Sequence, residues 1–101
     1  MLENEFTVQI DCMLEDLMPG FLQNRQTDIS SLEKMYAAQD LEGIKRLGHH
    51  LKGVGPNYGF QKLGEMGAAI EIAACHGKLD SIGLIIQRMR EYMSRVKIQY
   101  C

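Results

Sequence analysis

Apolar residues recur every three or four positions along most of the chain, which is the period of an amphipathic helix. The pattern divides into four stripes, formed in chain order by Leu22, Ile29, Leu32 and Tyr36; by Leu41, Ile44, Leu47 and Leu51; by Leu63, Gly67, Ile70 and Ala74; and by Ile82, Ile85, Ile86, Met89, Met93 and Val96. Because the connections between the stripes are short, sequential helices must be neighbours. The pattern therefore predicts an all-α fold, an antiparallel four-helix bundle over about residues 12–95.

Polar residues and one proline mark where the helices should begin. Asp11 can cap a short N-terminal helix that covers one end of the bundle, and Pro19 suits the first turn of the first long helix. Asp40 and Asp80 are the expected N-caps of the second and fourth long helices, since a carboxylate can accept hydrogen bonds from the free N–H groups of a first turn.

Other residues indicate where the long helices should end. The first is expected to end near Gln39, and the Gly55-Pro56-Asn57 segment should break the second, because proline removes a backbone donor. The His76-Gly77 pair is typical of a C-terminus and should close the third helix.

The two ends of the chain alternate apolar and polar residues with a period of two, which is the period of a strand rather than a helix. Residues 7–11 and 95–100 carry this pattern. They predict a small two-stranded ribbon formed by the chain termini, although the second segment could equally continue the last helix.

Length and charge narrow the classes of partner. With 101 residues the chain can form one hydrophobic core, so we expect a single domain over residues 1–101. A net charge of −2 does not suit a nucleic-acid backbone, and no apolar run is long enough to span a membrane. The acidic start, MLENEFTVQID, lacks the features of a secretory signal, which favours the cytoplasm. No helix face is apolar all round, which favours a monomer.

Metal and disulfide chemistry find little support in the sequence. The cysteines form no CxxC pair, so neither a zinc site nor a disulfide framework is predicted. The expected roles of Cys12, Cys75 and Cys101 are core filler and a loose thiol in the C-terminal tail. A metal-binding bundle that uses His49, His50 and His76 remains an alternative, but the adjacent pair diverges by about 100° on a helix and cannot chelate one ion.

The two adjacent histidines should point in different directions. With Ile44 at zero on a helical wheel, His49 lies at about 140°, away from the core, and His50 at about 240°, where edge packing against a neighbouring helix is expected. The residues three and four positions from His49 are three cations and one bare backbone position: Lys45, Arg46, Lys52 and Gly53. On spacing alone, a solvated helix face explains this pattern. A neutral imidazole beside cations that can bind an anion would instead suggest a phosphate acceptor.

Two further residues fit the phosphate acceptor. Gly53 costs roughly 1 kcal/mol of helix propensity relative to alanine, but its missing side chain would let another molecule approach closely. A nucleophilic imidazole also needs its second nitrogen held by an acceptor, and Glu71 on the adjacent helix is the best candidate.

Together these residues resemble the signature of histidine-containing phosphotransfer (HPt) domains, which is HxLKG, then an NxG(F) turn and a later LE. The matching segments are His49-His50-Leu51-Lys52-Gly53, Asn57-Tyr58-Gly59-Phe60 and Ile70-Glu71, and the likeness extends to residues 16–22 and 38–40. It thus covers nearly the whole chain. Gly48, where the family often has alanine, is a departure that should cost helix propensity without touching the chemistry.

The resemblance implies a role for each site residue. His49 would carry the phosphoryl group, Lys52 would stabilise it, Glu71 would support the imidazole ring, and Gly53 would leave room for a partner. Lys45 and Arg46 could add supporting charge.

The resemblance also implies a phosphorelay protein that exchanges a phosphoryl group with aspartates of response-regulator receiver domains, fed by a hybrid histidine kinase. Such a carrier has no kinase activity of its own and needs no cofactor, since Mg²⁺ is expected on the partner receiver domain. The alternative is a helical adaptor, a pseudo-HPt protein, that binds a receiver domain without being phosphorylated.

Overall fold

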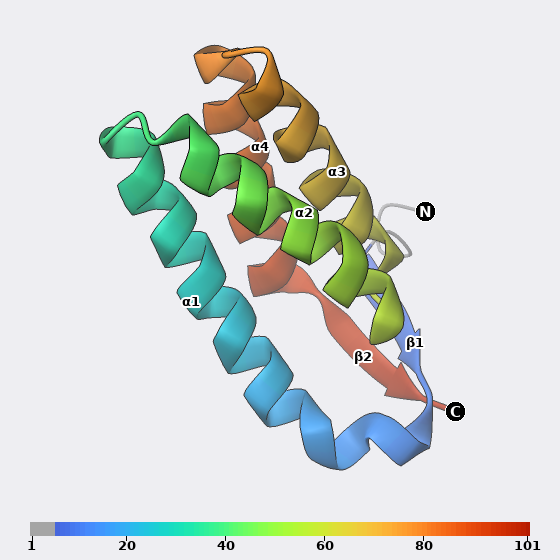
Figure 1. Ribbon diagram of the computed structural model, residues 1–101. Coiled ribbons are helices and arrows are strands. Elements are labelled where there is room, and N and C mark those ends of the chain that lie inside the picture. Colours follow the sequence, from blue (N-terminus) through green and yellow to red (C-terminus); the bar gives the residue numbers. More distant parts are fainter. Residues whose placement is uncertain (1–5) are drawn as a thin grey trace.

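A computed structural model describes residues 6–101 and shows the expected antiparallel bundle of four helices (Figure 1). A six-residue 3-10 helix, η2 (Cys12–Leu17), leads into the bundle. The four long helices are α1 (Met18–Ala37), α2 (Leu41–Asn57), α3 (Gln61–Cys75) and α4 (Leu79–Arg95). The all-α prediction and the number of long helices are therefore confirmed.

Most of the predicted helix starts are confirmed by their capping contacts. The Asp11 carboxylate accepts a hydrogen bond from the Met13 N–H at 2.9 Å, and the Asp40 carboxylate accepts one from the Gly43 N–H at 3.0 Å. Pro19 lies in the first turn of α1. Asp80 was predicted wrongly as a cap, because the chain turns so tightly at Gly77, whose φ is +66°, that α4 already begins at Leu79.

One predicted helix end is confirmed, near Gln39, and another needs correction. α1 ends at Ala37, two residues before Gln39, whose φ of +54° places it in the left-handed region of the turn. α2 is not broken at residues 55–57 but continues through Asn57 with Pro56 inside it. The proline ring is accommodated because Gly64 of α3 faces it: a Cβ on Gly64 would lie 2.7 Å from Pro56 Cδ. The predicted end of the third helix is confirmed, with His76 as the C-cap.

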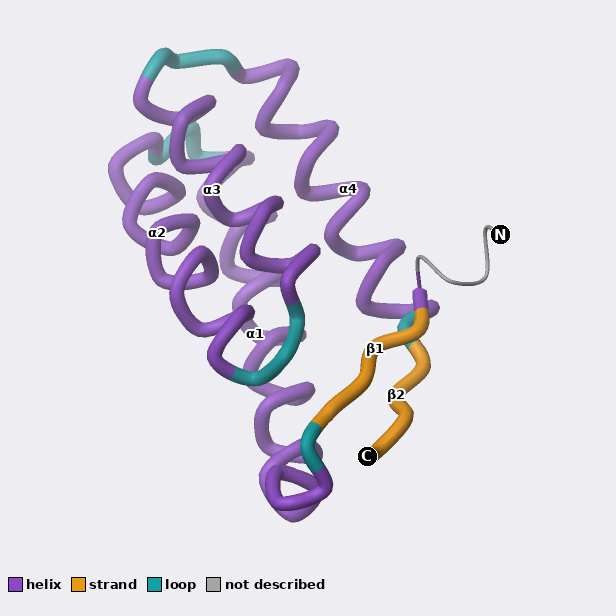
Figure 2. The backbone as a smooth tube through the Cα atoms, turned by 90° about the vertical axis from the view of Figure 1, so that its right-hand side faces the viewer, coloured by secondary structure: helices purple, strands orange, loops and turns teal. Residues whose placement is uncertain are grey.

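The chain termini form the predicted two-stranded ribbon, so the second segment does not continue the last helix. Strand β1 (Thr7–Ile10) pairs in parallel with β2 (Lys97–Tyr100), and Val8 and Ile10 are buried. Figure 2 shows the two strands side by side next to the end of α4. The last residues of the chain thus contact its first described ones.

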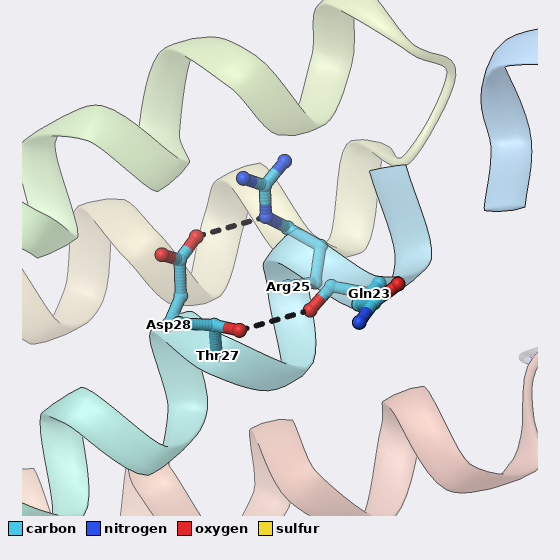
Figure 3. A network of polar contacts seen from close by, with 4 residues as sticks. All are labelled: Gln23, Arg25, Thr27 and Asp28. Atoms are coloured by element: carbon cyan, nitrogen blue, oxygen red, sulfur yellow. Dashed lines mark hydrogen bonds and ion pairs between the residues drawn. The ribbon is translucent and has the colours of Figure 1, made fainter. Parts of the chain in front are cut away.

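The core follows the predicted stripes, and α1 adds a charged residue to it. All four predicted stripe residues of α3 are buried, whereas α1 also buries a charged residue, Arg25. Figure 3 shows its guanidinium pointing from α1 toward α2, with Nε donating to Asp28 Oδ2 at 2.9 Å. The same group lies 4.7 Å from the centre of the Phe21 ring. An aromatic face and a carboxylate therefore replace the water that burial removes.

Tyr92, a buried phenol on α4, makes stability depend on pH in the alkaline range. Burial raises the pKa of its hydroxyl above the ordinary value of 10.0. Above about pH 10 the unfolded chain releases this proton first, so unfolding becomes more favourable as the pH rises, whereas below that pH both states keep it. In urea unfolding between pH 7 and 11, the wild type should lose stability more steeply above pH 10 than Tyr92→Phe, and parallel curves would contradict this.

Candidate functional site

His49 lies in the middle of α2 with its side chain 69% exposed, as its position on the helical wheel predicted. His50 is exposed as well, so the expected edge packing of this residue is wrong. Leu47 and Val54, about one turn away on either side, pack against the core on that flank instead. His49 and His50 are thus two exposed imidazoles of one helix with different surroundings.

Glu71 of α3 holds the His49 ring by one nitrogen. Its Oε2 lies 2.9 Å from His49 Nδ1, and its side chain is only 22% exposed. An ionised carboxylate can only accept a hydrogen bond, so Nδ1 must carry the hydrogen and donate it. The neutral ring is then left with its lone pair on Nε2, the nitrogen directed away from Glu71. The geometry therefore fixes both the ring orientation and the tautomer that a nucleophile requires.

Lys52 lies beside the same carboxylate, one turn after His49 on α2. Its Nζ is 3.8 Å from Glu71 Oε1, and its side chain is 54% exposed. An exposed ion pair at this distance contributes little stability, so the ammonium can leave it for another anion at small cost. Glu71 thus contacts both the His49 imidazole and the Lys52 ammonium on one side of α2.

The remaining predicted site residues, Lys45, Arg46 and Gly53, lie about one turn from His49 on α2. Lys45 is half-buried and Arg46 is exposed, and among residues 6–101 neither forms an ion pair. Gly53 is exposed, and a Cβ added to it would meet nothing within 4 Å. The surface next to Lys52 is therefore open to an approaching molecule.

Four glycines bring α2 close enough to α3 for the contact between His49 and Glu71. A Cβ on Gly48 would lie 2.9 Å from the Gly67 carbonyl oxygen, and a Cβ on Gly67 would lie 2.8 Å from that of Gly48. Further along, a Cβ on Gly55 would lie 2.8 Å from the Gly64 nitrogen. Gly48 thus has a packing role that the sequence analysis missed. The signal was the seven-residue spacing of Gly48 and Gly55, which puts them on one helix face.

The site is a surface and not a pocket. A cavity of about 430 Å³ lies between α3 and α4, lined in part by Met66, Ala69 and Ile85, and includes neither His49 nor Glu71. The exposed His49 ring is therefore accessible to another macromolecule.

Neither a metal site nor a membrane span is found within residues 6–101. No group of three His, Cys, Asp or Glu side chains lies close enough to hold an ion, so the metal-binding alternative has no set of ligands there. His76 instead lies at the end of α3, where its Nδ1 donates to the Ile72 carbonyl oxygen at 3.0 Å. None of the helices in this part of the chain is long and apolar enough to cross a membrane.

Comparison with known proteins gives one match. The family model described as Hpt domain matches residues 16–99, which include all four long helices and every site residue discussed above. Neither the comparison with curated proteins nor the one with solved structures gives a match.

Proposed function

This chain belongs to the Hpt domain family, whose members carry phosphoryl groups in phosphorelays, and we propose that it accepts and passes on a phosphoryl group at His49. The observation that carries the proposal is the 2.9 Å contact between His49 Nδ1 and Glu71. It supports a reactive Nε2 on a ring that is 69% exposed. The partners are phosphorylated receiver domains of response regulators.

The transfer step needs no proton movement. His49 Nε2 attacks the phosphorus of a phosphoaspartate, so that an N–P bond forms while the P–O bond breaks and aspartate leaves as a carboxylate. The imidazole gains a positive charge, which the hydrogen bond from Nδ1 to the Glu71 carboxylate stabilises. The reverse step passes the group to the aspartate of the next receiver domain.

Lys52 is the main electrostatic support in this proposal. When the phosphoryl group is on His49, its oxygens carry more charge than the Glu71 carboxylate, so the exposed ammonium can turn toward them. Lys45 and Arg46, four and three residues before His49, add positive charge on the same side of α2. These cations neutralise a group that would otherwise repel the carboxylate of Glu71.

In this proposal the partner proteins supply the metal ion and the phosphoryl group. The proposal gives this chain no metal and no other cofactor, because Mg²⁺ is expected on the partner receiver domain, and no kinase activity of its own. The phosphoryl group would come from a hybrid histidine kinase. We place this exchange in the cytoplasm and expect the carrier to act as a monomer.

Phosphoryl transfer from a partner tests the proposal directly. The purified chain would be mixed with a panel of phosphorylated receiver domains and Mg²⁺, and its intact mass followed with time. We expect one added phosphoryl group that is lost in acid, as a phosphohistidine is. If neither a receiver nor acetyl phosphate or phosphoramidate labels the folded chain, the proposal is wrong. Receiver binding without any label would instead favour the non-phosphorylated adaptor.

Gly53 gives a test of docking that separates stability from function. Gly53→Ala should raise the free energy of unfolding by up to about 1 kcal/mol, because the added methyl group meets nothing within 4 Å and alanine is the better helix former. The same methyl group lies on the surface that a receiver domain must approach. Transfer should therefore slow roughly tenfold for each 1.4 kcal/mol by which the free energy of docking is weakened.

The matched control for this variant is Gly20→Ala. Gly20 is exposed in the first turn of α1 and also has nothing within 4 Å of an added Cβ. We expect its transfer rate to equal that of the wild type, measured by the same mass assay. Transfer by Gly53→Ala at the wild-type rate would show that Gly53 has no part in docking.

A further inference from the structure

The structure brings two cysteines together from opposite ends of the chain. The Cys12 N–H donates to the Cys101 carbonyl oxygen at 3.0 Å, and the Cys101 N–H donates to the Ile10 carbonyl oxygen at 3.0 Å. These two bonds extend the parallel β1–β2 ladder by one step beyond the Ile10–Tyr100 pair, so Asp11 is the residue opposite Cys101 and Cys12 is the residue after it. Cys12 and Cys101 are therefore joined by a backbone hydrogen bond, although they are 89 positions apart in the sequence.

The hydrogen bond limits how far apart the two Cα atoms can lie. Even if the N–Cα bond of Cys12, the hydrogen bond, and the span from the carbonyl oxygen to Cα of Cys101 lay in one line, they would reach about 6.9 Å. Real bond angles bend this path and shorten it. Disulfides join Cα atoms that are about 4.4–6.8 Å apart, so the backbone places this pair within bonding range.

The thiols are also accessible, and that of Cys101 points toward β1. All three cysteines of the chain are free and exposed, so the expected role of core filler is wrong. Cys101 Sγ lies 3.7 Å from the Ile10 carbonyl oxygen, which points its thiol toward the end of β1, just before Cys12. Cys75 is at the last position of α3 and forms no part of this ladder. Of the three possible cysteine pairs, only Cys12 and Cys101 are therefore linked by the backbone hydrogen bonds at the end of the ladder.

We propose that Cys12 and Cys101 form an intramolecular disulfide by exchange with a low-molecular-weight disulfide such as oxidised glutathione. One thiolate attacks the small disulfide, forms a mixed disulfide and releases one small thiol. The second cysteine thiolate then attacks the protein-bound sulfur of the mixed disulfide and releases the second small thiol. Two protein thiols are oxidised and one small disulfide is reduced to two thiols, which take up the two protons. No metal or further oxidant is needed.

The bond would join the two ends of the chain covalently. It would close a loop that includes η2, all four long helices and β2, so it would restrict the unfolded chain strongly. In the folded protein it would fix the β1–β2 ribbon, whose strands are otherwise held by hydrogen bonds. The inference uses none of the residues around His49, so it stands or fails independently of the proposed phosphotransfer.

Oxidation of the reduced, folded chain by oxidised glutathione tests the inference. The intact mass should fall by two hydrogens, the number of free thiols should fall from three to one, and digestion should yield a Cys12–Cys101 linked peptide. The melting temperature should rise by roughly 10 °C on oxidation and return on reduction. Cys75→Ser should behave in the same way, with no free thiol left after oxidation.

Two variants and one alternative outcome make the test decisive. Cys12→Ser and Cys101→Ser should each stop at a glutathione adduct and show no rise in melting temperature. If the wild-type chain also accumulates glutathione adducts at Cys12 and Cys101 without losing two hydrogens, the inference is wrong. A linkage that forms between two chains, or one that includes Cys75, overturns it as well.

Discussion

Gly67→Ala is expected to lower the free energy of unfolding by about 2 kcal/mol, which is roughly a 30-fold change in the unfolding equilibrium. The added Cβ would lie 2.6 Å from the Lys52 nitrogen and 2.8 Å from the Gly48 carbonyl oxygen. Both are backbone atoms of α2 and cannot move aside alone, so the two helices must separate. The strain exceeds the gain of up to about 1 kcal/mol that alanine brings to a helix interior.

Gly53→Ala is the matched control for this measurement. It is the same substitution inside a helix, but its Cβ meets nothing within 4 Å, so it should change stability in the opposite direction. Urea unfolding of both variants at one pH gives the comparison. If Gly67→Ala is as stable as the wild type, α2 and α3 do not need their close approach.

The same variant should also disturb the site. Gly48 precedes His49 in the sequence, and Gly67 lies one turn before Glu71, so the glycine contact sets the separation across which His49 Nδ1 reaches Glu71. A wider separation would lengthen that hydrogen bond and release the imidazole. Helix packing and chemistry are therefore linked through four backbone positions.

The bundle could be predicted from the sequence because its elements depend on local patterns. Amphipathic periodicity identified all four long helices, and the carboxylates of Asp11 and Asp40 cap the helices that follow them. The differences arose where a particular side-chain contact, between helices or within one, overrides a general preference. Pro56 stays helical because Gly64 leaves space for its ring, and Arg25 is buried because Phe21 and Asp28 receive its charge.

The candidate site could be predicted only in part. The helical wheel placed His49 on the surface because that depends on one helix alone. The distance from His49 to Glu71 depends on how α2 and α3 are aligned, and the periodicity of neither helix sets that alignment. The proximity of Cys12 and Cys101 was missed for the same reason, since it requires a parallel ladder between segments at opposite ends of the chain.

His49→Gln should abolish phosphoryl labelling, while His50→Gln should be labelled like the wild type. The two histidines are adjacent and both are exposed, so the substitutions are alike in composition, charge and expected effect on folding. They differ in that His49 donates to Glu71 and so presents Nε2, and glutamine has no nitrogen lone pair that could replace it. Intact-mass measurement after incubation with a phosphorylated receiver domain and Mg²⁺ gives the result.

The pair of variants also separates the phosphotransfer proposal from the adaptor. If the chain is a carrier, His49→Gln loses all transfer to a second receiver domain. The variant should still bind the first receiver domain, because only one exposed side chain changes and the glycine contacts between α2 and α3 remain. An adaptor would keep its whole function in both variants. Labelling that persists in His49→Gln, or that disappears in His50→Gln, would show that His50 is the nucleophile. The contact between His49 and Glu71 would then have no role in choosing the nucleophile.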